Sequence, residues 1–347
     1  MGKNEESITH LFEQALLVSE DELELSFLFV DASPWEQFLL NPRRLRGSDF
    51  LMRWSQGKWS EDRLLAAIED TGEFFAVPYG ISSVAPDEDP RASELYFEFL
   101  ERADAGEIKR PDLLVFPMRV HKEVQDILQD IGALPAPASV VSMEEQEDAL
   151  RFFQGLQPEQ RLPFFEESHP LLQSLIHLSL LAVEAENSLW ITEMMPSFRE
   201  SLRPMARLGG KPGLPKSAVT PTIIIKDEDL PLLGAWEQKN QTPVHIWHVF
   251  YDRAFGISLE EAVRLINDGY ISGTAQTFQA PGGATTKKTI YKIYHHYAYP
   301  LATTTEPPTL TADRIIDKNG HILPYVRFSG GRIRLTEKAI TVLRGLL

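Results

Sequence analysis

Three acidic residues have a type and spacing that could perform chemistry. Glu184 and Glu186 are separated by one residue in the apolar stretch LLAVEAEN, and Asp112 opens a second apolar stretch, LLVF. Because side chains alternate along a strand, Glu184 and Glu186 would point to the same face. Neighbouring carboxylates repel each other and are costly to bury, and a divalent cation removes both penalties. The pattern therefore favours a metal site.

The two stretches would bring all three carboxylates together if they paired as strands. Mg²⁺ prefers hard oxygen ligands and keeps several waters, so a few carboxylates and a phosphate oxygen suit it. The ion could polarise a phosphate and lower the pKa of an attacking water. Each motif has an ordinary alternative, since Pro-Asp before a strand is usually a turn and E-x-E is usually a solvated face. Their combination on two apolar strands is more informative than either alone.

The elements that must position these carboxylates are helices and strands in mixed order. We expect helices at 59–68, 93–105, 227–240 and 258–269, and strands at 74–79, 109–117, 179–187, 222–226 and 244–251. This order predicts an α/β fold in which one central mixed β-sheet is flanked by helices. We expect residues 1–255 to form the core, with a helical insertion at about 120–178. Residues 256–347 would form a β-rich C-terminal lobe that contacts the substrate.

Composition restricts the class of protein. The 347 residues contain no cysteine, which excludes disulfides, zinc-thiolate sites and cysteine nucleophiles. No basic stretch followed by an apolar run opens the chain, and no window is apolar enough to span a membrane, so we expect a cytoplasmic protein. The histidines show no zinc-like spacing. The glycines lack the phosphate-loop arrangement, so no nucleotide cofactor is expected.

Basic residues are segregated although the formal net charge is −16. Residues 201–220 and 271–300 contain lysine or arginine and no acid, so one face could hold double-stranded DNA while the others stay acidic. Arginine can bind phosphate or read guanine, and glutamine can read adenine. For any single residue, an ordinary surface position is the alternative. The candidate DNA-binding residues are Arg43, Arg44, Arg46, Arg53, Gln56, Lys211, Lys216, Lys287 and Lys288.

Several ordered segments carry a family resemblance. They are NPRRLRGSDFLMRWSQGKWSE (41–61), FFAVPYGISSVAP (74–86), ELYFEFLERADAGEIKRPDLLVF (94–116), VEAENSLW (183–190), IIIKDEDLPLLGAW (223–236) and HVFYDRAFGISLEEA (248–262). Over roughly residues 40–265 the chain resembles the AccI-type restriction endonucleases of the PD-(D/E)XK nuclease superfamily. The resemblance implies a restriction-endonuclease-like core and Mg²⁺-dependent, sequence-specific cleavage of duplex DNA. It also implies a homodimer, because a two-fold protein matches a two-fold site.

The resemblance also assigns roles. It makes Asp112 an acidic metal ligand and Glu184 the first acid of the E-x-K element, in which Glu186 replaces the usual lysine. Glu186 would then accept the proton of the attacking water or bind a second metal. Lys226 could supply the missing ammonium, or it could be a surface lysine paired with an aspartate. A helical glutamate often completes such sites, and Glu61 is the first candidate, with Glu94 and Glu98 as rivals.

Three other functions stay open. The replacement of the lysine by Glu186 is compatible with a catalytically inactive DNA-binding module of the same fold. A pair of carboxylates could also serve a glycoside hydrolase. An acidic interaction protein without an active site is the third alternative. Salt-sensitive binding to duplex DNA and Mg²⁺-dependent nicking would separate these classes.

Overall fold

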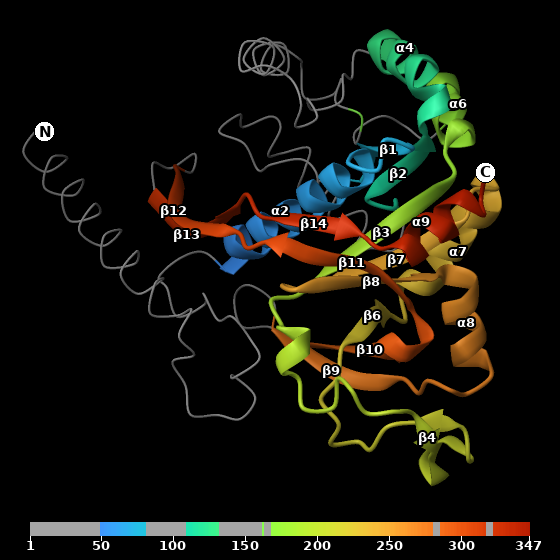
Figure 1. The fold of residues 1–347 in the computed structure, drawn as a ribbon, viewed down its shortest axis with the longest axis vertical. Coiled ribbons are helices and arrows are strands. Elements are labelled where there is room, and N and C mark those ends of the chain that lie inside the picture. The colour runs from blue at the N-terminus through green and yellow to red at the C-terminus, as the bar shows by residue number, and fades with distance from the viewer. Residues whose placement is uncertain (1–48, 81–108, 132–161, 163–167, 280–284, 317–321) are drawn as a thin grey trace, which may run out of the picture.

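The computed structural model describes residues 49–80, 109–131, 162, 168–279, 285–316 and 322–347. A seven-stranded sheet lies at its centre, with the strand order β1-β2-β3-β7-β8-β11-β14 (Figure 1). These strands are β1 (Phe74–Pro78), β2 (Leu113–Pro117), β3 (Leu181–Asn187), β7 (Val244–Val249), β8 (Arg253–Ser258), β11 (Tyr299–Glu306) and β14 (Arg332–Leu335). Only the pair β3–β7 is parallel within this sheet. The predicted α/β class with a mixed sheet is therefore confirmed.

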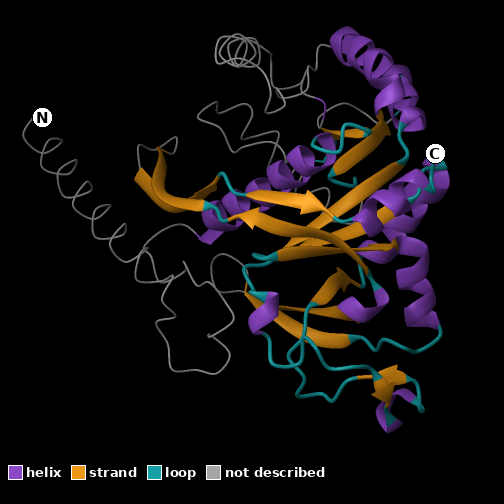
Figure 2. Cartoon of the chain, viewed as in Figure 1, coloured by secondary structure: helices purple, strands orange, loops and turns teal. Residues whose placement is uncertain are grey.

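The two faces of the sheet bury separate cores, as strand alternation requires. On β3, Ala182 packs into one core and Val183 into the other. The core with Ala182 is covered by α4 (His121–Ile131), α6 (Pro170–Leu178), α7 (Asp229–Asn240) and α8 (Leu259–Asn267), and we call this side the α7 face. The core with Val183 is covered by α2 (Asp49–Glu69) and α9 (Glu337–Arg344), and we call it the α2 face. Helices consequently flank both sides of the sheet (Figure 2).

A smaller sheet of three strands lies below the central one in Figure 1. Its order is β6-β10-β9, with β6 (Thr222–Lys226), β9 (Thr274–Gln279) and β10 (Thr285–Tyr294). The expectation that residues 222–226 join the central sheet is wrong. The alternation along β6 specifies only that Ile223 and Ile225 share one buried face. Pairing with β10 buries that face in the core on the α7 face, so the apolar pattern does not decide which sheet the strand joins.

Two further hairpins and several short helices complete the described chain. β12 (Thr309–Ile316) pairs with β13 (Ile322–Ser329), and β4 (Arg203–Pro204) pairs with β5 (Pro212–Gly213). The 3-10 helices are η4 (Met118–Val120), η7 (Thr192–Met194), η8 (Ala206–Leu208) and η9 (His295–Tyr297). Within the described ranges, no helix combines the length and apolarity that a membrane crossing needs.

The structure changes some expected boundaries. The helix expected at 59–68 begins ten residues earlier, at Asp49, and ends before Gly72, whose positive φ of 67° suits glycine. Of the expected helical insertion, α4 and α6 lie in the described residues. The helix expected at 93–105, with Glu94 and Glu98, lies outside them. Strands β11 and β14 belong to the central sheet although they come from the expected C-terminal lobe, and the boundary near residue 255 stays a prediction.

Candidate active site

Asp112 is fixed at the point where β1, β2 and β3 meet. Its backbone amide donates to the carbonyl of Val183 at 2.7 Å, and its Oδ2 accepts from the amide of Ala185 at 2.7 Å. Its carbonyl accepts from the amides of Tyr79 and Gly80 at 2.7 and 2.9 Å. The strands that carry Asp112 and Glu184 do pair, with Leu113 opposite Val183, which meets the condition under which the three carboxylates would converge. The carboxylate is therefore held against the strand segment that carries both glutamates.

Glu184 and Glu186 follow Ala182 on the α7 face of β3, as the alternation predicts. Glu184 is 7% exposed, and its Oε1 accepts from Lys109 Nζ at 2.5 Å. Burial is the largest influence on its carboxyl group, and together with repulsion from Asp112 and Glu186 it outweighs Lys109 and raises the pKa to about 8. Glu184 Oε2 is buried and has no hydrogen-bond partner among the described residues.

Lys109 is the functional candidate that sequence reasoning missed. Besides its bond to Glu184, its Nζ lies 3.9 Å from Asp229 Oδ1 at the start of α7. Burial lowers the pKa of Lys109, but attraction by Glu184, Asp229 and Asp112 outweighs burial and raises it. The side chain therefore carries a positive charge. Its position three residues before Asp112 was the one signal available in the sequence.

Lys226 approaches the same cluster from the end of β6. Its Nζ lies 3.5 Å from Asp229 Oδ2, and attraction by Asp229 and Glu186 outweighs burial and raises the pKa of Lys226. Burial raises the pKa of the half-buried Glu186, with Lys226 and Lys109 opposing the shift. Lys226 therefore pairs with an aspartate and also acts electrostatically on Glu186, so both alternatives stated for it hold together. The cluster contains four carboxylates and two ammonium groups.

His248 is the neighbour of Glu186 on the adjacent strand, because the parallel register pairs these two positions. Burial lowers the pKa of His248 to about 3, so its imidazole is neutral. His245 lies on the opposite face, where its Nδ1 contacts Tyr299 Oη at 2.9 Å. The two histidines, three positions apart on β7, thus occupy opposite faces of the sheet, and both are buried.

Glu61 is the candidate extra acid on α2. It is buried on α2, which packs its Leu64 and Ile68 against the α2 face of the sheet. Glu184 and Glu186 lie on the α7 face, so the sheet stands between the helix and the two glutamates. The role of Glu61 as an extra acid of the site stays a prediction.

The candidate DNA-binding residues are distributed over several surfaces. Arg43, Arg44 and Arg46 lie outside the described residues, as does the side chain of Arg53 on α2, and Gln56 is half-buried on the same helix. Among the lysines, Lys211 donates to the carbonyl of Asp268, and Lys288 pairs with Glu228 at 2.6 Å.

Lys216 and Lys287 are both exposed. Of these two lysines, Lys216 lines a groove beside the small sheet.

A divalent cation is implied by the site chemistry, and its fit can be judged from the side chains. Within the part of the chain that the structure describes, no group of three or more His, Cys, Asp or Glu side chains is arranged to hold a metal ion. Lys109 lies against Glu184 instead, and one oxygen of Asp112 is used by the Ala185 amide. The donor chemistry nevertheless suits a hard cation, because the buried Glu184 Oε2 lacks a partner among these residues.

The fold and the cluster define an α/β protein with an acidic and lysine-rich site at the junction of paired strands. The model of the AccI restriction endonuclease family matches residues 217–346, which confirms the resemblance to AccI-type restriction endonucleases. That family implies a nuclease that binds DNA. No curated protein and no solved structure matches the chain.

The matched segment overlaps only the C-terminal part of residues 40–265, which carry the resemblance in the sequence. It extends from β6 to α9 and includes Lys226 and Asp229. Asp112, Glu184 and Glu186 precede it. Their assignment therefore depends on the geometry described above.

Proposed function

We propose that this protein is a type II restriction endonuclease that uses Mg²⁺ to hydrolyse phosphodiester bonds at a specific sequence in double-stranded DNA. One observation carries the proposal. Asp112, Glu184 and Glu186 gather around Lys109 and Lys226 at the junction of β2 and β3. The family match over residues 217–346 supports the same class of activity.

The cluster combines the two kinds of group that phosphodiester hydrolysis requires. Water attacks phosphorus, and the bond from phosphorus to the leaving sugar oxygen breaks as the new bond forms. Negative charge on the phosphate grows during this step, and a fixed ammonium stabilises it. Lys109 and Lys226 are both held in the charged form by neighbouring carboxylates, so they suit this electrostatic role and not that of a base.

Glu186 is the candidate base. Its raised pKa makes it a better proton acceptor than an ordinary carboxylate, since catalytic efficiency increases as the pKa approaches the working pH. It is half-buried, whereas Glu184 is almost fully buried. Glu186 would therefore take the proton of the attacking water. The positive charge of Lys226 lowers the pKa of Glu186 and would help it return to the ionised form.

Asp112 and Glu184 would hold the metal, with Glu186 as a further oxygen donor. A bound divalent cation would polarise the phosphate and lower the pKa of the water. Lys109 occupies one oxygen of Glu184, and Oε2 of the same carboxylate stays available among the described groups. Before the metal binds, the positive charge of Lys109 would offset the negative charge of Glu184.

We also propose the restriction-endonuclease-like core and the homodimer that this class implies. The core would extend over residues 1–255 and would include β11, β14 and α9, which belong to the central sheet and its cover. The rest of residues 256–347 would form the DNA-contacting lobe. A two-fold dimer would place two copies of the cluster on the two strands of a palindromic site. Sedimentation with and without duplex DNA measures the oligomeric state.

The test is digestion of unmethylated phage DNA with Mg²⁺, followed by sequencing of the fragment ends. We expect discrete ends at one recurring sequence. Asp112→Asn keeps the shape and an acceptor for the Ala185 amide, and it should lower the cleavage rate by about a hundredfold or more. Asp126→Asn, on the exposed side of α4, is the matched control and should cut normally.

The inactive DNA-binding module predicts a different result. It would bind duplex DNA in a salt-dependent manner and leave supercoiled plasmid intact with Mg²⁺. Equal cleavage by Asp112→Asn and the wild type would remove Asp112 from the reaction. Absence of both binding and cleavage would overturn the proposed class altogether.

A further inference from the structure

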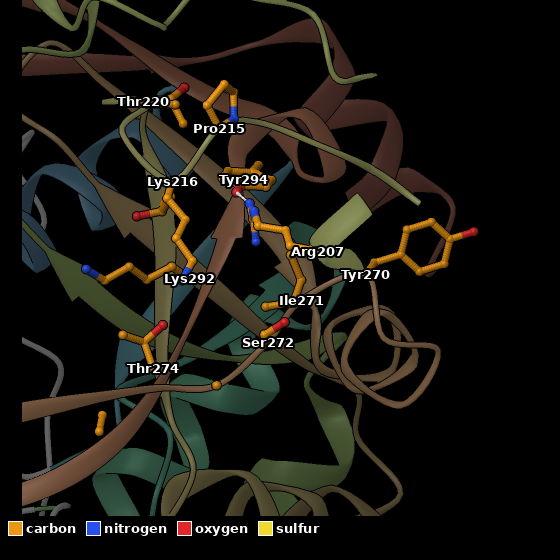
Figure 3. A pocket seen from close by; sticks show the side chains of 14 residues that line it. Arg207, Pro215, Lys216, Thr220, Tyr270, Ile271, Ser272, Thr274, Lys292 and Tyr294 are labelled. Atoms are coloured by element: carbon orange, nitrogen blue, oxygen red, sulfur yellow. Dashed lines mark hydrogen bonds between the residues drawn. The ribbon is translucent and has the colours of Figure 1, made fainter. Parts of the chain in front are cut away.

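A groove with a volume of about 710 Å³ opens between the segment after β5 and the small sheet (Figure 3). Three of the residues that line it are cationic, namely Arg207, Lys216 and Lys292. Hydroxyl groups of Thr222, Ser272 and Thr274 lie along the same walls. None of its described lining residues is an aspartate or glutamate. The groove therefore offers positive charge and hydrogen-bond donors without a competing acid.

The described residues provide no ion-pair partner for the positive charges of the groove. Among the described residues, Arg207, Lys216 and Lys292 form no ion pair within 4.0 Å. The whole chain has 50 acidic and 34 basic residues, so a groove lined by three cations and no acid differs from the average composition of the protein. A local positive potential in an acidic protein attracts an anionic ligand.

The wall that carries these cations is pre-organised. Arg207 Nη2 donates to the carbonyl of Leu214 at 2.6 Å and to Tyr294 Oη at 2.9 Å. Tyr297 Oη donates to the carbonyl of Pro212 at 2.9 Å, and Lys211 Nζ donates to the carbonyl of Asp268 at the C-terminal end of α8. Arginine has five N–H donors, so Arg207 can anchor this wall and still offer donors to a ligand.

The groove is connected to the carboxylate cluster along one face of β6. Thr222 lines the groove, Ile224 lines an adjoining cavity of about 270 Å³, and Lys226 reaches Asp229. These alternate positions share one face of the strand. Thr222 and Lys226 are four residues apart, which corresponds to about 13 Å along a strand.

Lys292 lies in both spaces. It is opposite Ile224 on β10 and lines the groove as well as the adjoining cavity, which also contains His248. The residues that line these two spaces include no aspartate or glutamate. A row of phosphate groups could therefore extend from the groove toward Glu186 without repulsion from them.

We propose that this groove binds the sugar–phosphate backbone of duplex DNA a few nucleotides from the scissile bond. The inference rests on the proposed function and locates its substrate on the protein. Lysine and hydroxyl groups of this kind bind phosphate oxygens and position the duplex without reading its sequence. The volume exceeds what one phosphate group fills, so the ligand is a stretch of backbone.

The test compares two variants of equal charge. Lys216→Gln/Lys292→Gln removes two groove cations and spares Arg207, whose bond to Leu214 supports the wall. Lys122→Gln/Lys338→Gln removes two exposed lysines from α4 and α9, away from the groove. Binding of a fluorescent 30-base-pair duplex is measured without divalent ions by anisotropy, as a function of NaCl concentration.

For the groove variant we expect the slope of log K against log salt to decrease in magnitude by about two, because each lost phosphate contact removes about 0.9. The loss of affinity should be the same for unrelated duplex sequences. The control variant should keep the slope of the wild type. Circular dichroism and thermal melting confirm that both variants fold.

Each other outcome decides the matter. A groove variant that binds with the affinity and slope of the wild type overturns the groove assignment, and normal plasmid cleavage by the wild type would then leave the proposed function intact. An equal loss in the control variant would reveal a general charge effect and would also overturn the assignment. A wild-type protein that neither binds nor cuts duplex DNA would end both proposals.

Discussion

The carboxylate of Asp112 accepts a hydrogen bond from the backbone amide of Ala185 at 2.7 Å. Ala185 separates Glu184 from Glu186, so this bond joins Asp112 to the middle of the E-x-E element. The side chain of Ala185 points to the α2 face, and the two glutamates lie on the other face. A charge-assisted hydrogen bond of this kind is stronger than a neutral one and fixes the geometry of the three acids.

Gly80 is expected to protect this geometry. A Cβ atom at Gly80 would lie 2.8 Å from Asp112 Cα and 2.9 Å from the carbonyl oxygen of Pro111, and backbone atoms cannot move aside easily. Gly80→Ala should destabilise the protein by about 1–3 kcal/mol through overpacking and lower the cleavage rate as Asp112 shifts. Urea unfolding and plasmid nicking measure the two effects.

Gly234→Ala provides the matched control for that substitution. Nothing lies within 4 Å of the position of its Cβ, and it is inside α7. Alanine should stabilise the helix by about 0.5–1 kcal/mol and leave cleavage unchanged. Equal effects of the two substitutions on cleavage would contradict the role of close packing at Gly80.

Lys109 is expected to matter as much as Lys226. Lys109→Met removes the ammonium beside Glu184 and should reduce the cleavage rate by about 10²–10³-fold, the range seen when one electrostatic donor is lost. DNA affinity should change little because Lys109 is mostly enclosed by carboxylates. Single-turnover cleavage and binding without metal separate these effects, with Lys122→Met on exposed α4 as the control. Normal cleavage by Lys109→Met would reduce Lys109 to a structural counter-ion.

Metal binding should depend on pH through Glu184. Burial and neighbouring acids raise its pKa to about 8, and a metal ligand must be deprotonated, so Mg²⁺ affinity should increase as pH rises from 6 to about 8. The rise in melting temperature caused by Mg²⁺ or Ca²⁺ measures this affinity. Glu184→Gln should abolish the metal-induced rise, and removal of metal with EDTA should reverse it in the wild type. A metal-induced rise that does not vary with pH would exclude Glu184 as the titrating ligand.

Acid should destabilise the fold through His248. Burial lowers its pKa to about 3, below the unfolded value of 6.5. The sign follows from linkage, because the unfolded state binds the proton more readily. The contribution of His248 to stability is complete above pH 6.5 and decreases as pH falls toward 3.

His248→Leu should make the free energy of unfolding less dependent on pH between 6.5 and 4. His177→Gln, on an exposed position of α6, should keep the dependence of the wild type. Denaturant unfolding at several pH values provides the comparison. An unchanged pH dependence in His248→Leu would show that other groups control acid stability.

The sequence by itself determined most of the strands that carry the acids. The apolar runs expected at 74–79, 109–117 and 244–251 contain strands β1, β2 and β7, although β2 begins only at Leu113, because continuous apolarity between turn residues specifies a buried strand. The period of two along β3 also determined that Glu184 and Glu186 share a face. These features are local, so they can be read from neighbouring residues.

Only the tertiary structure decided which groups meet the acids. Lys109 looks like an ordinary lysine in the sequence KRPD, and Asp229 looks like a helix-start residue, yet both contact the cluster. The pairing of β6 with β10, and not with the central sheet, brings Lys226 to Glu186. These contacts join residues that are far apart in the chain, and they depend on how the small sheet packs against the central sheet. The local pattern of apolar and polar residues does not specify that packing.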